Sequence, residues 1–345
     1  MRMSLRILFF VVTLVSCTCC STTDKNVDVK DAHFDIICKL SNNISELGSV
    51  KSLSVFNDGF AVTANPNEVY IYDFEGIQRF SLGNSGNARF EFNNPLIIRS
   101  HEDSLYLWSA NSLKFIVYSK DGKPASEYTY SSAIRDFVPS KDELIIYNSG
   151  VNDSYIIDIY DKNKKEVKES LFKSSNEHKI LLSWMSVAPL IYDDTYIIFT
   201  SKDKSTVIKY DKLCKTQTTY NIQSQTFDVD KVANIDILQN RRKMSDYLMS
   251  NSVSVMLIPY HKKQNLLLTL EGYDVLDETN RTVDYSNRYY ALYNVDSGQP
   301  KAYYRYESLT PMYLFSIYKN SVYFIRRECN ADLDEESYYL CRLKL

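Results

Sequence analysis

The sequence predicts an all-β protein, a six-bladed β-propeller with four antiparallel strands in each blade. Three observations lead to this prediction: an aromatic-rich composition, a motif that recurs about every 45 residues, and a spare strand before the first repeat that matches a strand missing from the last one. The chain has 345 residues, of which 28 are tyrosine and 16 are phenylalanine. Aromatic residues suit the half-buried surface of a sheet. The hydrophobic fraction of 44% excludes wholesale disorder, and the net charge of −3 gives no basic excess for a nucleic-acid partner.

The first residues have the features of an export signal. Arg2 and Arg6 precede an apolar run over residues 7–15, which is too short to span a bilayer as a mature helix. The run ends in Leu-Val-Ser-Cys at residues 14–17, which resembles the bacterial lipoprotein box. That resemblance implies that residues 1–16 are removed and that Cys17 carries the lipid. The alternative is an ordinary secretory signal with incidental cysteines.

The polar residues that follow, 17–32, are predicted to form a flexible tether. The propeller domain is then expected over residues 33–345, as a monomeric domain. Several acyl chains on one cysteine would anchor the protein to a membrane. The predicted location is therefore the cell envelope, with the lipid in the outer membrane and the domain on the periplasmic side or outside.

A tyrosine that follows an apolar run and precedes a polar turn marks the repeat. It recurs at Tyr72, Tyr118, Tyr160, Tyr210 and Tyr293. The spacings are 46, 42, 50 and 83 residues, and Cys341 takes the same place 48 residues later. A period near 45 with several short strands is typical of propeller blades, and the long spacing indicates one insertion.

The second repeat divides into four strands, at 95–100, 104–109, 113–119 and 124–131. Turn residues separate these strands, and Asp121-Gly122 is a strong hairpin signal.

The remaining blades are expected at 49–83, 133–172, 187–222 and 253–307. The last blade, from 311 to 345, has only three strands, whereas residues 33–41 form a strand with no blade of its own. Pairing this first strand with the last blade closes the ring and removes exposed edges.

A seventh blade within 223–252 is the alternative. The stretch 229–251 shows no alternation, and its apolar residues fit one helical stripe instead.

A local sequence resemblance supports the prediction of six blades. The stretch GNSGNARFEFNNP at 83–95, with YSKDG at 118–122, resembles the blade junction of NHL-type and TolB-like propellers. The resemblance implies a six-bladed fold. It weakens elsewhere, because the chain has only 9 glycines and most blades lack the glycine turns of those families.

Propeller function resides in the loops, and the longest loops are expected together on one face. They are 83–94, 174–186, 223–252, 272–287 and 329–336. Arginine and aromatic residues dominate recognition. Candidate binding residues on this face are Arg89, Trp184, Arg241, Arg242 and Tyr285. The alternative is that the arginines lie on the solvated face of a helix, with Trp184 packed beneath it.

The innermost strands supply one acid, Asp136, next to Arg135, and both are candidate binding residues. One carboxylate is too few for a hard cation, and the four histidines are scattered. The sequence therefore predicts no metal, no cofactor and no catalytic residue. An acidic cluster at 332–336 suits calcium or, more simply, solubility.

Two cysteines are expected to face each other where the ring closes. Cys38 lies within the first strand and Cys341 within its proposed partner, so a disulfide would lock the ring. Cys329 is the competing partner for Cys341, and free buried thiols are the third alternative.

These observations favour a non-catalytic module that binds or scaffolds a protein or glycan through its long-loop face. A hydrolase or lyase acting on envelope or extracellular saccharides is the alternative. A sensor domain that works with a neighbouring membrane protein is a third hypothesis.

Overall fold

A computed structural model describes most of the domain. The described residues are 29–31, 33–41, 50–64, 67–149, 154–176, 178–179, 190–201, 206–222, 240, 253–261, 264–272, 288–305, 313–330 and 335–344. In this part of the chain no helix is both long and apolar enough to cross a membrane.

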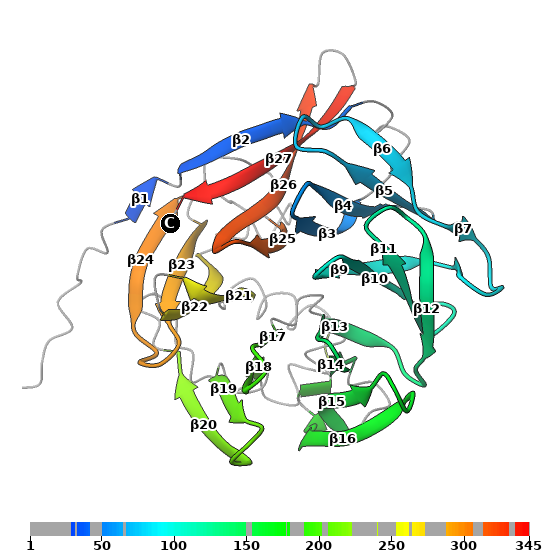
Figure 1. Cartoon of the computed structure of the whole chain (residues 1–345). Helices are drawn as coiled ribbons and strands as arrows, with labels where there is room; N and C mark the ends of the chain where they lie inside the picture. Colours follow the sequence, from blue (N-terminus) through cyan, green and yellow to red (C-terminus); the bar gives the residue numbers. More distant parts are fainter. Residues whose placement is uncertain are drawn as a thin grey trace, which may run out of the picture.

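Six antiparallel four-stranded units stand in a ring around a central axis, as the sequence predicts (Figure 1). In each blade the first strand is innermost, and the chain runs outward to the rim. Blade 1 contains β3 (Val50–Phe56), β4 (Gly59–Ala64), β5 (Glu68–Tyr72) and β6 (Gln78–Ser81). Blade 2 contains β9 (Pro95–His101), β10 (Ser104–Ser109), β11 (Lys114–Ser119) and β12 (Pro124–Thr129). Blade 3 contains β13 (Ile134–Pro139), β14 (Glu143–Asn148), β15 (Tyr155–Asp161) and β16 (Glu166–Lys173).

The second half of the ring follows the same order. Blade 4 contains β17 (Leu190–Tyr192), β18 (Tyr196–Ser201), β19 (Thr206–Asp211) and β20 (Thr216–Asn221). Blade 5 contains β21 (Val253–His261), β22 (Gln264–Gly272), β23 (Arg288–Asn294) and β24 (Pro300–Arg305). Blade 6 contains β25 (Tyr313–Tyr318), β26 (Ser321–Asn330), β27 (Glu335–Lys344) and, as its outer strand, β2 (His33–Lys39). A short parallel pair, β7 (Asn84–Ser85) and β8 (Glu91–Phe92), lies between blades 1 and 2.

The ring closes where the sequence predicts. β2 pairs antiparallel with β27, from His33 opposite Lys344 to Lys39 opposite Tyr339. Asp35 adds ion pairs to Arg342 at 2.8 Å and Lys344 at 2.6 Å. The outer strand of blade 6 therefore comes from the start of the domain, and its other three strands come from the end.

The recurring tyrosine anchors blades 1 to 5, because its side chain is buried and the next residue caps the following turn. Tyr72, Tyr118, Tyr160, Tyr210 and Tyr293 are all buried. Asp161 Oδ1 accepts hydrogen bonds from the amides of Asn163 and Lys164, and Asp211 Oδ1 does the same for Leu213 and Cys214. These side-chain caps satisfy amides that the tight turn leaves without a strand partner.

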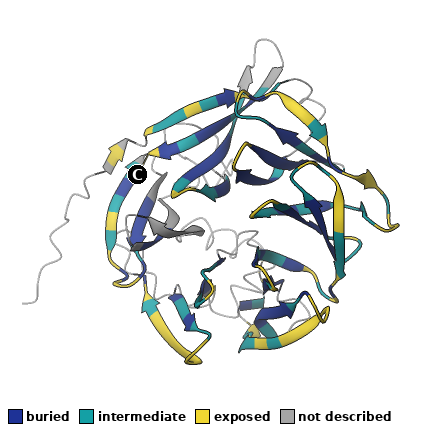
Figure 2. Cartoon of the chain, viewed as in Figure 1, coloured by how far each residue is buried: buried dark blue, intermediate teal, exposed yellow. Residues whose placement is uncertain are grey.

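The hydrophobic core is divided into inter-blade layers. Six clusters of buried residues are found in the described part of the chain, and each joins two neighbouring blades around the complete ring. Trp108 is fully buried between blades 2 and 3, with its ring centroid 4.7 Å from that of Phe115. The second strands β4, β10 and β14 are almost entirely buried, and the outer strands β16 and β20 are largely exposed (Figure 2). Each blade thus depends on both neighbours for burial of its faces.

The strand β1 (Val29–Asp31) lies within the region expected as a tether. It pairs parallel with the end of β24, from Val29 opposite Tyr303 to Asp31 opposite Arg305. The last residues of the 17–32 segment therefore belong to the edge of blade 5. Residues 1–28, including the signal peptide and Cys17, lie outside the described residues.

The expected disulfide between Cys38 and Cys341 is not formed. Both thiols are free and buried. A bulge in β2 sets Ile36 opposite Cys341 and Cys38 opposite Leu340. Cys38 therefore packs in the layer between blades 6 and 1, whereas Cys341 packs in the layer between blades 5 and 6. Burial raises the pKa of Cys38 to about 11 and that of Cys341 to about 12, so both are protonated thiols at neutral pH.

The competing cysteine pair is not a cross-strand pair either. Cys341 lies opposite Phe324, and Cys329 lies opposite Glu336 near the far end of the same hairpin. The pairing of β26 with β27 extends to Asn330 opposite Glu335, so the expected loop at 329–336 is shortened to 331–334. The predicted helix at 229–251 lies outside the described residues, apart from Asn240.

Candidate functional site

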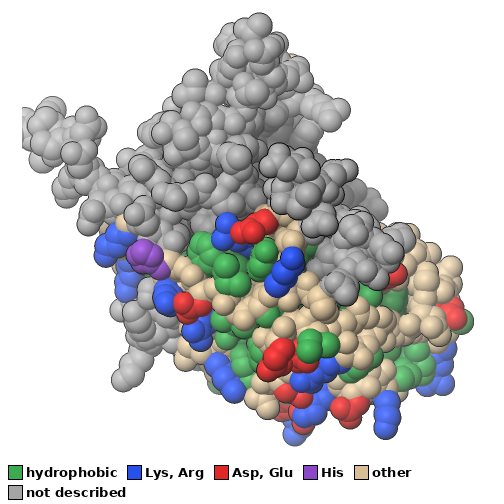
Figure 3. Space-filling view, turned by 90° about the horizontal axis from the view of Figure 1, so that it is seen from above, with side chains coloured by type: hydrophobic (Ala, Val, Ile, Leu, Met, Phe, Trp, Pro, Cys, Tyr) green, Lys and Arg blue, Asp and Glu red, His purple; other side chains and the backbone are tan. Residues whose placement is uncertain are grey.

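The two faces of the ring differ in the length of their connections. One face, called here the turn face, carries the short turns between strands 1 and 2 and between strands 3 and 4 of each blade. The other, called the loop face, carries the connections between blades, including the 31 residues between Asn221 and Val253. In Figure 3 lysine, arginine, aspartate and glutamate side chains alternate over the described part of the surface, with no large patch of one sign.

The innermost strands line the centre of the ring, and together they are called here the channel wall. Strands β3, β9, β13, β17, β21 and β25 contain four Lys, Arg, Asp or Glu residues: Lys51, Arg99, Arg135 and Asp136. Three are cations, in a chain whose net charge is −3. The channel wall is therefore more basic than the protein as a whole.

The one acid in the described innermost strands is held in an ion pair between blades 2 and 3. Asp136 Oδ1 lies 2.6 Å from Arg99 Nη2 and also accepts a hydrogen bond from the Phe137 amide at 2.8 Å. Burial raises the pKa of Asp136, although Arg99 and the Phe137 amide act in the opposite direction. The carboxylate thus joins two blades and is not free to act on a ligand.

Serine side chains join other inner strands of the ring. Ser316 Oγ accepts a hydrogen bond from the Val55 amide at 2.9 Å, between blades 6 and 1. Ser52 Oγ accepts one from the Ile98 amide at 3.1 Å, between blades 1 and 2. The innermost strand of a blade has no strand on its inner edge, so side chains of the neighbouring blade accept hydrogen bonds from its amides.

Bulges interrupt the inner strands close to the loop face. In blade 1 the register shifts between Val50 and Ser52, and in blade 3 it shifts between Ile134 and Asp136. The extra residues are Lys51 and Arg135. Bulges commonly redirect a side chain at the rim of a barrel or beside a site, and here the bulged residues are two cations at the loop-face ends of their strands.

These two cations differ from Arg99 in having no acid to pair with. Lys51 Nζ donates to Asn94 Oδ1 at 2.9 Å. Arg135 has a buried Nε with no hydrogen-bond partner, and no ion pair joins its guanidinium to another residue of the described chain. Burial lowers the pKa of both side chains.

The other candidate residues are only partly placed. Arg89 is exposed on the connection between blades 1 and 2, with its guanidinium 4.7 Å from the centroid of the Phe90 ring. Trp184, Arg241, Arg242 and Tyr285 lie outside the described residues, so their grouping on the loop face stays a prediction. Asp136 and Arg135 are neighbours in sequence, but Asp136 pairs with Arg99 instead.

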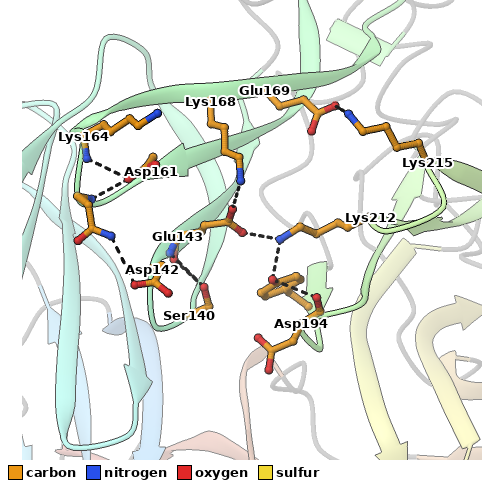
Figure 4. Close-up of polar contacts among 12 residues, drawn as sticks. Ser140, Asp142, Glu143, Asp161, Lys164, Lys168, Glu169, Asp194, Lys212 and Lys215 are labelled. Atoms are coloured by element: carbon orange, nitrogen blue, oxygen red, sulfur yellow. Dashed lines mark hydrogen bonds and ion pairs between the residues drawn. The ribbon is translucent and has the colours of Figure 1, made fainter.

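A charged network on the turn face, between blades 3 and 4, was not foreseen from the sequence (Figure 4). Glu143, at the start of β14, accepts from Lys168 at 2.9 Å and from Lys212 of the next blade. Lys212 also donates to the Tyr192 hydroxyl at 2.7 Å. Burial raises the pKa of Glu143, but hydrogen bonds from Lys212 and Lys168 outweigh it and lower the pKa overall.

The sequence contains a signal for this network. The triplet Tyr-Asp-Lys ends the third strand in both blade 3 and blade 4, at 160–162 and 210–212. Lys162 reaches back to the Tyr106 hydroxyl of blade 2 at 3.0 Å, just as Lys212 reaches back to Glu143 of blade 3. The repeated lysine is therefore an inter-blade contact.

A polar cleft of about 340 Å³ opens beside this network, lined by Ser140, Lys141, Asp142, Asp161, Tyr192 and Asp194. Both carboxylate oxygens of Glu143 accept hydrogen bonds from lysines, so this residue holds blades 3 and 4 together. This contact is called here the Glu143 clamp, and its role is structural. Among the described residues no group of three His, Cys, Asp or Glu side chains is placed to hold a metal ion.

Comparisons with known proteins define the fold. Models of known protein families give no match to the chain, and a search of curated proteins gives none either. Two solved structures from Bacteroides share the fold over almost their whole length. One, from Bacteroides vulgatus, is a member of the DUF4221 family, with a TM-score of 0.60 and 11% identity over 91% of this chain and 99% of that one. The other is a candidate exported protein from Bacteroides fragilis, with a TM-score of 0.58 and 12% identity over 92% of this chain and 98% of that one.

Identities of this size show a shared fold and leave the function open. The NHL-type and TolB-like resemblance of residues 83–95 stays a prediction.

We expect Glu143→Gln to lower the free energy of unfolding by about 1–3 kcal/mol at neutral pH, because it removes two charge-assisted hydrogen bonds. The pKa of Glu143 is lowered in the fold, so this stabilisation is present above its ordinary value of 4.5 and is lost as the pH falls through the lowered pKa. The difference between variant and wild type, measured by urea unfolding across the acidic range, should shrink accordingly.

Glu169→Gln is the matched control. Glu169 pairs with Lys215 at 3.1 Å, and 68% of the Lys215 side chain is exposed. Exposed pairs contribute about 0–1 kcal/mol, so this variant should remain close to wild type. Equal losses in the two variants, or a Glu143→Gln loss that does not change with pH, would contradict the clamp.

Proposed function

We propose that the protein is a lipid-anchored binding module of the cell envelope that engages a glycan or protein through its loop face. The lipid on Cys17 holds it at the outer membrane, and the propeller acts as a rigid scaffold. In this proposal Arg89, Trp184, Arg241, Arg242 and Tyr285 contribute to the loop-face surface. The exported structural neighbour supports a location outside the cytoplasm.

One observation favours binding over catalysis. In the described innermost strands the single acid, Asp136, is engaged by Arg99 and by the Phe137 amide, whereas Arg135 has no partner among the described residues. A hydrolase would need a carboxylate free to transfer a proton or to attack. A binding site needs donors that are unsatisfied until the ligand arrives, and Arg135 has that property.

The first test concerns the anchor. We expect Cys17→Ser to abolish membrane attachment, because the lipid can be added only to the cysteine of the lipoprotein box. The intact protein should sediment with membranes, whereas the variant should appear in the soluble fraction. Cys19→Ser and Cys20→Ser are controls that should stay with membranes. A Cys17→Ser protein that still sediments with membranes would disprove the anchor.

The second test separates binding from cleavage. Envelope polysaccharides, fractionated by charge, are incubated with the mature protein and then examined for retention and for chain length. We expect saturable retention of one fraction with its length unchanged. A steady release of new reducing ends, or of unsaturated sugar products, would instead support the hydrolase or lyase.

A further inference from the structure

We propose that the loop-face mouth of the channel binds a saccharide that carries carboxylate groups. Arg135 and Lys51 receive the carboxylates, and a group of asparagines beside Lys51 receives the hydroxyls. This inference rests on the proposed binding function and specifies the chemical class of its ligand.

The charge balance of the channel wall is the first argument. Arg99 and Asp136 neutralise each other at 2.6 Å. Lys51 and Arg135 are then the two uncompensated charges of the innermost strands, and both are positive. Uncompensated charges of one sign raise the local concentration of ligands of the opposite sign. An anion is therefore attracted to this mouth although the whole chain is slightly acidic.

The state of Arg135 is the second argument. Its side chain is half-buried at a bulge, and its Nε–H is buried without an acceptor. Because Nε is closed to solvent, a ligand can reach only the outer nitrogens of the guanidinium. A planar carboxylate matches them, since its two oxygens can accept from Nη1 and Nη2 together. A carboxylate would supply the acid that Arg135 lacks.

The surroundings of Lys51 favour a saccharide over an acidic peptide. Lys51 bonds to Asn94, Asn94 bonds to Asn111 at 3.4 Å, and Asn111 bonds to Asn93 at 3.1 Å. All three asparagines are at least partly exposed. Side-chain amides both donate and accept, and each has more hydrogen-bonding capacity than these contacts use. A surface of this kind suits a ligand with many hydroxyl groups.

The experiment uses the mature protein and trigalacturonate as the probe, with the methyl-esterified trisaccharide as the uncharged counterpart. Affinity is measured by isothermal titration calorimetry at low and at near-physiological salt. Wild type should bind the acid form, more weakly as salt rises, and should not bind the ester measurably. Arg135→Gln should weaken binding at least about tenfold and Lys51→Gln at least about threefold, because each loses a charged partner of the carboxylate. Arg135→Lys should fall between wild type and Arg135→Gln.

Arg79→Gln is the matched control, because Arg79 lies at the turn face and pairs with Asp58 at 3.5 Å. It should bind like wild type. Arg135 has no partner to lose, so Arg135→Gln should keep the thermal midpoint of wild type, which separates a loss of binding from a loss of fold.

Three results would overturn the inference: Arg135→Gln binding as tightly as wild type, the ester binding as tightly as the acid, or a hexaglutamate peptide binding as tightly as trigalacturonate. Retention of a different envelope fraction by wild type, without binding of trigalacturonate, would refute the ligand class and leave the binding function standing. Cleavage of trigalacturonate that also depends on Arg135 would support the ligand class and refute the non-catalytic function.

Discussion

Strand pairing between β2 and β27 joins the two ends of the domain, and the other contacts of the ring depend on it. Without β2, blade 6 would have three strands, and the outer edge of β27 would be open to pairing with another chain. Closure also completes the two hydrophobic layers on either side of blade 6, since Phe34 packs toward blade 5 and Cys38 toward blade 1. Because each layer needs both of its blades, closure links the stability of blade 6 to that of the whole ring.

The closed ring also explains the chemistry of the channel. Six inner strands face one another with no further strand to bond, so their polar groups are satisfied by side chains of the neighbouring blade. Ser52, Ser316 and the Arg99–Asp136 pair do this. On the turn face, Lys162 and Lys212 likewise bond to side chains of the preceding blade. Arg135 Nε, at the loop-face end of β13, is one of several buried polar atoms of the described residues that have no hydrogen-bond partner.

The repeat, the blade boundaries and the closing strand were predictable because each has a local signature. A tyrosine followed by a polar turn residue recurs in blades 1 to 5, and apolar and polar residues alternate along the strands between turns. The Cys38–Cys341 bridge was wrongly expected, because the one-residue bulge in β2, which turns Cys38 to the opposite face, leaves no mark in the sequence. Arg135 was identified by its position on an inner strand. Its lack of a partner could not be predicted, because it depends on whether Asp136 pairs with Arg135 or with Arg99. The Glu143 clamp joins Glu143, Lys168 and Lys212, which are distant in sequence. The repeated Tyr-Asp-Lys is the sequence pattern that indicates it.

Native-state hydrogen exchange, resolved by residue, tests the closed ring most directly. The amides that join β2 to β27 should open with the same free energy as the buried strand β14 of blade 3, because one cooperative unit contains both. If β2 exchanges far earlier than β14, as a frayed edge would, the strand is not an integral part of the ring and the account given for closure is wrong.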